Sequence, residues 1–275
     1  KIVKETAALA EAYRQAGVRV IRNEGETPKE IVNQTSSWSG QKHNSIYGQS
    51  AFEVFGHCLV SLWEVSISYG EFAHREAMVN IVVNDPEAVW LTMPAHYPTS
   101  AKPQIVNLTP GDPRIFPKTV LLGFGVPDKA HVKDFSKPRS SGNEMGAEIL
   151  RRMLEPFGWS VEIVYFDTKF AYHLDCIMSV LDEGLLAMPK DCLWTELPKQ
   201  YQDWEVLEVS VEDCLNGACN NVPLGNKLLV MTQGTKMARD LEKRGWTIIE
   251  VPYTECYRIF GSGIHCSTAS LWRES

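Results

Sequence analysis

The sequence predicts a mixed α/β protein. Segments with the apolar spacing of an amphipathic helix precede short runs of aliphatic and β-branched residues, and this order occurs three times along the chain. Gly, Pro and Asp turns separate most of the runs. With 275 residues, of which 44% are hydrophobic and 10% aromatic, the chain can bury a large core in one big domain or in two ordinary ones.

Two helix-strand pairs can be placed from their boundary residues. The apolar face over residues 5–16 predicts a helix followed by a strand in VRVIR (18–22). Asn143 can cap a second helix that ends near Gly158, before a strand in WSVEIVYF (159–166).

The third pair begins at Thr235, where a helix runs to Gly245 before a strand in WTIIEVP (246–252). Strand-strand-helix-strand groups can be traced at a spacing of roughly 50 to 60 residues, although no repeated sequence proves a repeat architecture. Six further segments predict short strands. They are GHCLVSL (56–62), TVLLGFG (119–125), CIMSVL (176–181), GLLAMP (184–189), WEVLEV (204–209) and KLLVM (227–231).

Charge and composition favour a small-molecule substrate. The net charge is −7, with a pI near 5.6, and Lys and Arg are scattered among acids, which argues against a nucleic-acid-binding surface. No apolar run approaches the ~18 residues of a membrane span, and the first helix is amphipathic, unlike a signal peptide. We therefore expect a soluble, intracellular protein that does not bind membranes. Residues 126–142 are polar and contain prolines, which predicts a long surface loop.

Two segments carry residues suited to nucleophilic catalysis. In GSGIHC (261–266), two glycines precede Cys266 and allow the backbone to approach a ligand closely. A buried, unreactive thiol is the alternative. In YHLDC (172–176), His173 and Asp175 are two apart at the start of a predicted strand, so they should project to one face. Such a His can take a proton from a thiol and return it to a leaving amine, or it can be a structural, hydrogen-bonded His.

The remaining cysteines and Asp112 carry weaker signals. The seven cysteines have irregular spacing without a CxxC pair, which predicts neither a disulfide framework nor a metal site, and most should be buried thiols. Asp112 lies in a Gly/Pro turn ahead of a strand, where an Asp often satisfies its own backbone.

Taken in order, these segments resemble the glycine amidinotransferase family and, more loosely, the dimethylarginine hydrolases and arginine deiminases that share its fold. The resemblance covers nearly the whole chain, and the last three of the segments that carry it are the most specific. The segments are SSWSGQKHNSIYGQSAFEVFGHCLVSL, LTPGDPRIFPKTVLL, NEMGAEILRRMLEPFGWSVEIVYF, YHLDCIMSVLDEGLLAMPKD, CNNVPLGNKLLV and IFGSGIHCSTASLWR.

The resemblance implies a five-bladed α/β propeller, the pentein fold, built from strand-strand-helix-strand modules. Residues 1–275 would form one such domain that lacks a little of its N-terminal module. It also implies a cytoplasmic enzyme of small-molecule biosynthesis that needs no metal or organic cofactor, and it is compatible with a homodimer.

In these families a cysteine thiolate attacks the guanidinium carbon and a His protonates the departing amine. The resulting amidino-cysteine is resolved by an amine or by water. Carried onto this chain, the resemblance makes Cys266 the nucleophile, His173 the general acid/base, and Asp175 a partner for the substrate cation or for the His. The donor would be arginine or a relative.

Two departures from the family pattern bear on the substrate. Gly56-His57 replaces an Arg-Asp pair whose Asp grips the guanidinium, and Thr109 replaces an acid, although Asp112 matches the acid three positions later. Fewer carboxylates weaken the case for a buried cationic group. His57 could instead supply a hydrogen bond or a proton.

Five polar residues beside the matched motifs are candidates for substrate binding. Asn221, Ser262, His265 and Thr268 could line the pocket or form loop hydrogen bonds. Arg139 lies within one position of a family arginine and could bind a substrate carboxylate.

Three functional hypotheses follow. The first is a transferase or hydrolase that moves an amidino group through a covalent Cys intermediate. The second is a Cys-His enzyme on the same scaffold that acts on a non-guanidine substrate by acyl or amide transfer or hydrolysis. The third is an inactive binding homologue, against which the intact Cys266, His173 and Asp175 stand.

Overall fold

The computed structural model describes residues 1–21, 52–61, 75–94, 106–261 and 263–271. The chain divides into two compact units. The first unit comprises Lys1–Val20, Gly111–Ser141 and Glu162–His265. The second unit comprises Ile21–Pro110, Gly142–Val161 and Cys266–Ser275. The expectation of one domain over residues 1–275 stays a prediction.

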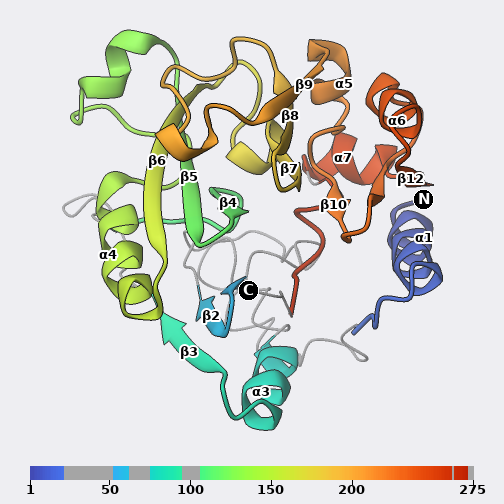
Figure 1. The fold of residues 1–275 in the computed structure, drawn as a ribbon, viewed down its shortest axis with the longest axis horizontal. Coiled ribbons are helices and arrows are strands. Elements are labelled where there is room, and N and C mark those ends of the chain that lie inside the picture. The colour runs from blue at the N-terminus through green and yellow to red at the C-terminus, as the bar shows by residue number, and fades with distance from the viewer. Residues whose placement is uncertain (22–51, 62–74, 95–105, 262, 272–275) are drawn as a thin grey trace. The chain divides into compact units, whose positions relative to one another are not determined.

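The described residues form a mixed α/β structure with four three-stranded sheets, which confirms the predicted fold class (Figure 1). In each sheet the first two strands are antiparallel, and in three of the sheets the third strand is shown to run parallel to the second. The sheets are β1 (Glu53–Phe55), β2 (Cys58–Ser61) and β3 (Val89–Thr92); β4 (Pro113–Phe116), β5 (Thr119–Val126) and β6 (Ser160–Asp167); β7 (Ser179–Asp182), β8 (Leu185–Pro189) and β9 (Glu205–Val209); β10 (Val222–Pro223), β11 (Leu228–Thr232) and β12 (Thr247–Val251).

Each sheet corresponds to one strand-strand-helix-strand module, because a helix lies in the chain between its second and third strands. These helices are α3 (Arg75–Asn84), α4 (Glu144–Leu154), the 3₁₀ helix η6 (Lys199–Tyr201) and α6 (Lys236–Glu242). The other helices of the described residues are α1 (Ile2–Gln15), α5 (Val211–Leu215), α7 (Thr254–Phe260), and the 3₁₀ helices η3 (Lys129–Lys133), η4 (Glu155–Phe157) and η5 (Leu174–Cys176). Among the described residues, none of the sheets closes on itself.

Side-chain caps start two of the predicted helices. Asn143 and Thr235 each accept a hydrogen bond from the backbone N–H three residues later, which satisfies a donor that the first helical turn leaves open. After both helices the chain turns at a glycine with positive φ, 75° at Gly158 and 81° at Gly245. The predicted starts of α4 and α6 are therefore confirmed.

The core of the first unit lies around β5, β8 and β11. All eight residues of β5 are buried, as expected for a strand whose sequence is an uninterrupted apolar run. The helix α1 contacts β12 and α7 (Figure 1), and Glu5 accepts hydrogen bonds from the backbone N–H groups of Glu255 and Cys256. In the second unit a smaller apolar cluster contains Phe52, Val54, Leu59 and Met78.

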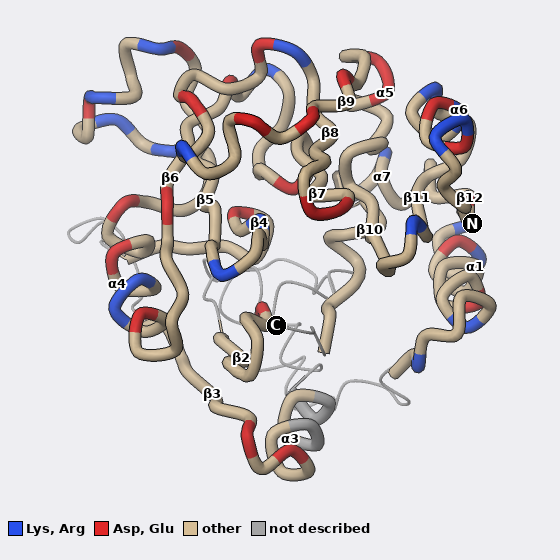
Figure 2. The backbone as a smooth tube through the Cα atoms, in the orientation of Figure 1, with Lys and Arg blue, Asp and Glu red and all other residues tan. Residues whose placement is uncertain are grey.

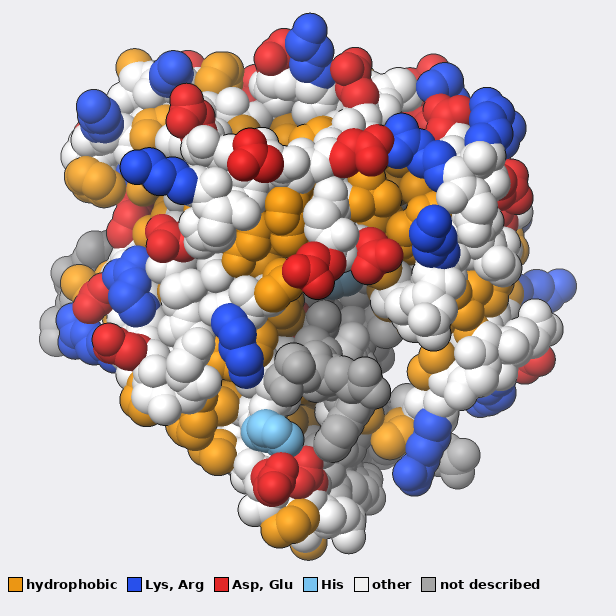
Figure 3. All heavy atoms as spheres, viewed as in Figure 1, with side chains coloured by type: hydrophobic (Ala, Val, Ile, Leu, Met, Phe, Trp, Pro, Cys, Tyr) orange, Lys and Arg blue, Asp and Glu red, His pale blue; other side chains and the backbone are white. Residues whose placement is uncertain are grey.

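Surface charges occur as close pairs of opposite sign. Figure 2 shows acidic and basic residues together on α4 and α6. Asp240 on α6 lies 2.7 Å from Lys236 and 3.0 Å from Lys243, and Glu148 on α4 lies 2.9 Å from Arg152. The face drawn in Figure 3 shows the same mixture of signs. Such exposed pairs contribute little to stability.

Among the described residues, no helix is both long and apolar enough to cross a bilayer.

Two strands predicted in the first 62 residues differ in the structure. Residues 18–21 do not join a sheet, and Arg22 lies outside the described residues, so VRVIR is not confirmed as a strand. GHCLVSL contains a turn and then β2, because Gly56 has a φ of +57° and, with His57, connects β1 to β2 as a hairpin.

The predicted surface loop at residues 126–142 is partly ordered by hydrogen bonds of its own. It contains η3, and Asp128 accepts from the backbone N–H groups of Ala130 and His131. Most of residues 127–139 are exposed or half-buried, in agreement with the prediction.

Candidate active site

The YHLDC segment forms a tight turn rather than the start of a strand. Leu174–Cys176 is a 3₁₀ helix in which the Leu174 carbonyl accepts from the Met178 N–H at 2.9 Å, and β7 begins only at Ser179. The expectation that His173 and Asp175 share a face of a strand is therefore wrong. Backbone hydrogen bonds within the turn, not the two-residue period of a strand, set their directions.

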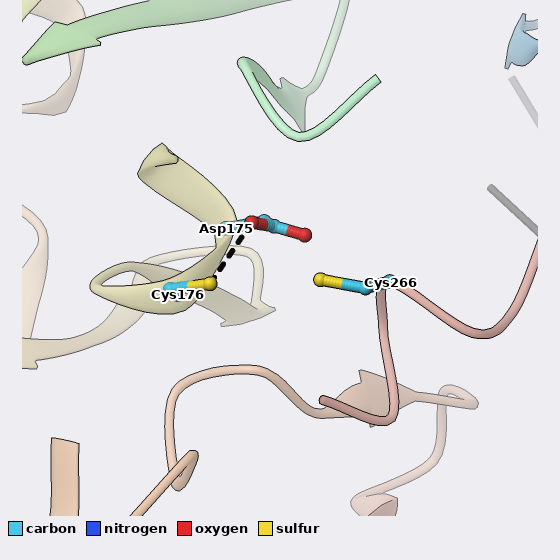
Figure 4. A group of neighbouring side chains, drawn as sticks. All are labelled: Asp175, Cys176 and Cys266. Atoms are coloured by element: carbon cyan, nitrogen blue, oxygen red, sulfur yellow. Dashed lines mark hydrogen bonds between the residues drawn. The ribbon is translucent and has the colours of Figure 1, made fainter. Parts of the chain in front are cut away.

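Asp175 is completely buried and has donors on both carboxylate oxygens. His265 Nδ1 lies 3.0 Å from Oδ2, and the Cys176 thiol donates to Oδ1 at 3.4 Å, as Figure 4 shows for the two neighbouring residues of η5. The Asp175 backbone N–H donates to the Gly111 carbonyl at 3.1 Å. The turn thus holds a carboxylate that water does not reach.

Hydrogen bonding keeps Asp175 ionised. Burial by itself would raise the pKa of the carboxyl group. The hydrogen bond from His265 and nearby positive charge, including that of Arg114, outweigh burial, and the pKa of Asp175 lies well below its ordinary value. A charged acceptor is therefore available to the imidazole of His265 at neutral pH.

The side chain of His265 lies between the guanidinium group of Arg114 and the carboxylate of Asp175. Its Nε2 atom is 2.9 Å from Nη1 of Arg114 on β4, and its backbone N–H donates to the Asn220 carbonyl at 3.2 Å. Arg114 is only 5% exposed, so it is a buried cation that requires such partners. The row Arg114–His265–Asp175 joins segments from three separate parts of the sequence.

Asn220 links the two motifs that carry the candidate catalytic residues. Its side-chain Nδ2 donates to the Asp175 carbonyl at 3.3 Å, while its own carbonyl accepts from His265. A methyl group on Gly263 would lie 2.2 Å from the Asn220 Oδ1 atom, so the backbone of the GSGIHC loop passes Asn220 at a distance that only glycine permits. The sequence did not single out Asn220 or Arg114. The doublet Asn220-Asn221 and a charged residue within an apolar strand were the available signals.

His173 presents a ring nitrogen without a partner. Its Nε2 atom is buried, and within the described part of the chain no hydrogen-bond partner lies near it. The ring of Tyr172 packs edge-on against the imidazole, with the two ring centroids 4.7 Å apart. A buried polar atom without a partner is costly unless another group binds there, so this nitrogen is suited to a group that the structure does not contain.

Asp112 and Asn221, both predicted to bind substrate, are buried and bonded to the protein. Asp112 accepts a hydrogen bond from the Ser141 hydroxyl, at the end of the 126–142 loop. Asn221 accepts from the Ser179 hydroxyl at 2.7 Å and donates to the Ala218 carbonyl at 2.7 Å. These bonds give both residues a structural role, and their predicted contact with substrate stays a prediction.

The side chain of Arg139 binds the backbone of its own loop. Its guanidinium donates to the carbonyls of His131 at 2.9 Å and Val132 at 3.3 Å, and it lies over the ring of Tyr165. These contacts close the loop around η3. Binding of a substrate carboxylate by Arg139 remains untested.

Four of the other candidates, His57, Thr109, Cys266 and Thr268, belong to the second unit. Thr109 is buried, whereas His57 is at the hairpin turn with a side chain that is 48% exposed and 3.7 Å from Glu87. Thr268 is partly exposed, and Ser262 lies outside the described residues.

Cys266 is 8% exposed and is joined directly to His265 by a peptide bond. Consecutive Cα atoms are about 3.8 Å apart, so fixing His265 restricts the position of the Cys266 backbone.

All seven cysteines lie in the described part of the chain, and all are buried, free thiols. This agrees with the prediction that most of them are buried. Burial raises the pKa of Cys192 to about 12 and that of Cys256 to about 11, with Glu5 adding to the effect at Cys256. Thiols with such values stay protonated at neutral pH and are poor nucleophiles.

Similar structures come from guanidine-modifying enzymes. No protein-family model and no curated protein matches the sequence. The amidinotransferase SxtG of the saxitoxin biosynthetic pathway in Microseira wollei matches with a TM-score of 0.74 and 17% identity, over 100% of this chain and 84% of that one. A dimethylarginine dimethylaminohydrolase matches with a TM-score of 0.70 and 16% identity, over 98% and 87% of the two chains.

A third match is the N-terminal domain of ArgZ, an arginine dihydrolase from the ornithine-ammonia cycle in cyanobacteria. The TM-score is 0.67 at 16% identity, over 99% of this chain and 88% of that one. At these identities the likeness concerns the fold. The fold expected from the sequence resemblance, that of the dimethylarginine hydrolases and amidinotransferases, is thereby confirmed.

Proposed function

We propose that this protein is a cysteine-dependent enzyme that transfers or removes an amidino group through a covalent intermediate on Cys266. The observation that carries the proposal is the buried Nε2 atom of His173, which has no hydrogen-bond partner among the described residues. A general acid/base needs such a nitrogen to be open toward the reacting group. The fold adds support, since the similar ArgZ domain has been solved covalently bound to a reaction intermediate.

The proposed reaction has two steps. His173 removes the proton from the Cys266 thiol, and the thiolate forms a C–S bond with the amidino carbon of the donor. The C–N bond to the leaving amine then breaks as His173 returns the proton to that amine. In the second step an acceptor amine or water attacks the same carbon and gives its proton to His173. The C–S bond then breaks, and the Cys266 thiolate takes the proton from His173, which restores the enzyme.

The buried turn at Asp175 supplies the negative electrostatic environment for this chemistry. Asp175 is ionised and linked to His265, whose backbone continues directly into Cys266. An ionised carboxylate in a buried site stabilises positive charge on a nearby imidazole or on the amidino group. In the proposed mechanism Asp175 stabilises the positive charge that develops on the catalytic imidazole or on the amidino group, and it does not itself transfer a proton.

The described modules and the similar structures also support a proposal about the fold of the whole domain. Four strand-strand-helix-strand modules are described, and the similar structures align with 98% or more of this chain. We infer that these modules belong to a five-bladed propeller. The likeness to SxtG also favours a place in small-molecule biosynthesis.

A second candidate function is acyl or amide transfer to or from a non-guanidine substrate. The favouring observation is that Asp175 already has a proton donor in His265 and a nearby cation in Arg114. His57 and Thr109 add no negative charge in place of the two family acids. Asp175 is compensated by these partners, and the buried Asp112 accepts from the Ser141 hydroxyl. Both acids therefore have less to offer a guanidinium ion, and a neutral carbonyl carbon would bind more easily.

Mass spectrometry of the intact protein separates the two functions. The protein is mixed with arginine and related guanidines, and an added mass of ~42 Da is expected, the mass of one amidino group on a thiol. Cys266→Ser should show no adduct, whereas Cys58→Ser, which removes another buried thiol of the second unit, should react like wild type. His173→Ala should accumulate the adduct far more slowly.

Two results would count against amidino transfer. One is an adduct of the same mass on Cys266→Ser. The other is the absence of any adduct in a protein whose Cys266 still reacts quickly with a mild alkylating agent. In that case acyl donors such as activated esters and thioesters should acylate Cys266, and the second function would replace the first.

A further inference from the structure

The row Arg114–His265–Asp175 fixes the protonation of its central imidazole. Arg114 Nη1 lies 2.9 Å from His265 Nε2, and Asp175 Oδ2 lies 3.0 Å from His265 Nδ1. A guanidinium group has only N–H donors and keeps its proton at any ordinary pH. His265 Nε2 must therefore accept, and an imidazole nitrogen that accepts carries no hydrogen.

The other ring nitrogen then carries the hydrogen. An ionised carboxylate can only accept, so the bond to Asp175 requires a hydrogen on Nδ1. Both contacts are satisfied together by a single form of the ring, which is neutral and has its hydrogen on Nδ1. A protonated ring would direct an N–H at an N–H of Arg114 and place two positive charges side by side where His265 is only 9% exposed.

We propose that Arg114 is a positioning residue: by donating to Nε2 it holds His265 in the neutral form whose Nδ1–H binds Asp175, and it thereby fixes the backbone that carries Cys266. The effect reaches Cys266 through one peptide bond, because the side chain of His265 is held at both ring nitrogens and its backbone N–H is held by Asn220. A loop with three such constraints loses most of its freedom before substrate binds.

Without Arg114, the charges around His265 would favour a different form of the ring. The charged and titratable groups around the row include Arg114 from β4, Asp175 and the thiol of Cys176 from η5, and His173 just before η5. The buried thiol of Cys219 interacts with Arg114, and the thiol of Cys266 is next to His265 in the chain. Removing the cation leaves an imidazole beside an ionised carboxylate, and a nearby negative charge favours protonation of a His. Nε2 would then carry a hydrogen and the ring a positive charge.

Nitrogen NMR of ¹⁵N-labelled histidine reads this state directly. In the resting wild-type protein at pH about 7, His265 should show one protonated and one unprotonated ring nitrogen, a neutral ring by the ordinary criteria. The signals are assigned by their loss in His265→Gln. A doubly protonated ring in wild type overturns the proposal, whatever the variants do.

Three arginine variants complete the test. Arg114→Met should convert His265 to the doubly protonated ring at pH about 6, close to the ordinary pKa of imidazole. Arg114→Lys keeps a donor and a charge, and should keep the neutral ring. Arg244→Met, which removes a partly exposed arginine paired with Glu205, is the matched control and should leave the ring unchanged. A neutral ring in Arg114→Met would overturn the proposal.

The catalytic role of Arg114 rests on the proposed function, whereas the state of His265 does not. If Cys266 forms the amidino adduct, Arg114→Met should slow its formation by about 10- to 100-fold, the scale on which a misplaced catalytic group slows a reaction. Arg114→Lys should restore part of the rate. An unchanged rate in Arg114→Met would overturn the positioning role. If wild type forms no adduct with any donor, the proposed function fails and the NMR result still decides the state of His265.

Discussion

Gly111 lies so close to His173 that a methyl group added to its Cα would be 2.6 Å from Cγ of the imidazole. The same glycine accepts the Asp175 backbone N–H through its carbonyl. One residue without a side chain therefore sets the position of both members of the HxD motif, which lie 62 and 64 residues further along the chain. The requirement is steric, because no real Cβ approaches ring atoms this closely.

Gly111→Ala should displace His173 and slow formation of the Cys266 adduct. The added methyl group must push the imidazole or the turn aside, which costs about 1 to 3 kcal/mol in folding stability. Gly184→Ala is the control, since its φ of +82° also strains an added side chain but nothing lies within 4 Å of the methyl position. Both variants should be less stable in urea unfolding, and only Gly111→Ala should lose adduct rate. Equal rates in the two variants would contradict the role assigned to Gly111.

Asp175→Asn should flatten the dependence of stability on acidic pH. The pKa of Asp175 is lowered in the folded protein, so the folded state holds fewer protons than the unfolded chain. Its contribution is complete above the ordinary carboxyl pKa of about 4 and is lost as the pH falls toward the lower pKa of the folded state. Urea unfolding from pH about 7 to about 3 should show a steeper loss for wild type than for Asp175→Asn. Parallel curves would show that Asp175 gains no stabilisation from its partners.

Asn220→Ala should destabilise the first unit. The variant removes the Nδ2 donor to the Asp175 carbonyl and leaves that buried acceptor without it, which costs about 1 to 3 kcal/mol. Asn216→Ala, at an exposed position of the same loop, should change the free energy of unfolding by about 0.5 kcal/mol or less. The comparison is made by thermal and urea unfolding of both variants. A loss for Asn220→Ala no larger than that of the control would contradict the linking role of Asn220.

Local sequence signals predicted most of the regular structure. Asn143 and Thr235 were expected to cap helices, and both do so with hydrogen bonds to residues only three positions away. The apolar run at β5 was expected to be a strand, and all of its residues are buried. These features depend on neighbours in the chain, so a sequence without alignment contains the information.

The turn at His173 differs from the strand that the sequence predicts. The residues of CIMSVL (176–181) have the composition of a strand, and the HxD motif directly precedes them. In the structure β7 begins at Ser179, because the Gly111 carbonyl binds the Asp175 N–H and a 3₁₀ turn forms instead. A partner from another segment decided the conformation.

The sequence by itself determined which chemical groups are present: a thiol at Cys266, an imidazole at His173, a carboxylate at Asp175, and the helices and strands that carry most of the chain. Only the tertiary structure decided which groups meet. Arg114 and His265 are 151 residues apart and His265 and Asp175 are 90 apart, yet they form one hydrogen-bonded row. The physical reason is that a buried charge must find a partner wherever the packing of the chain brings one, and the spacing of residues along a sequence contains no direct record of that packing.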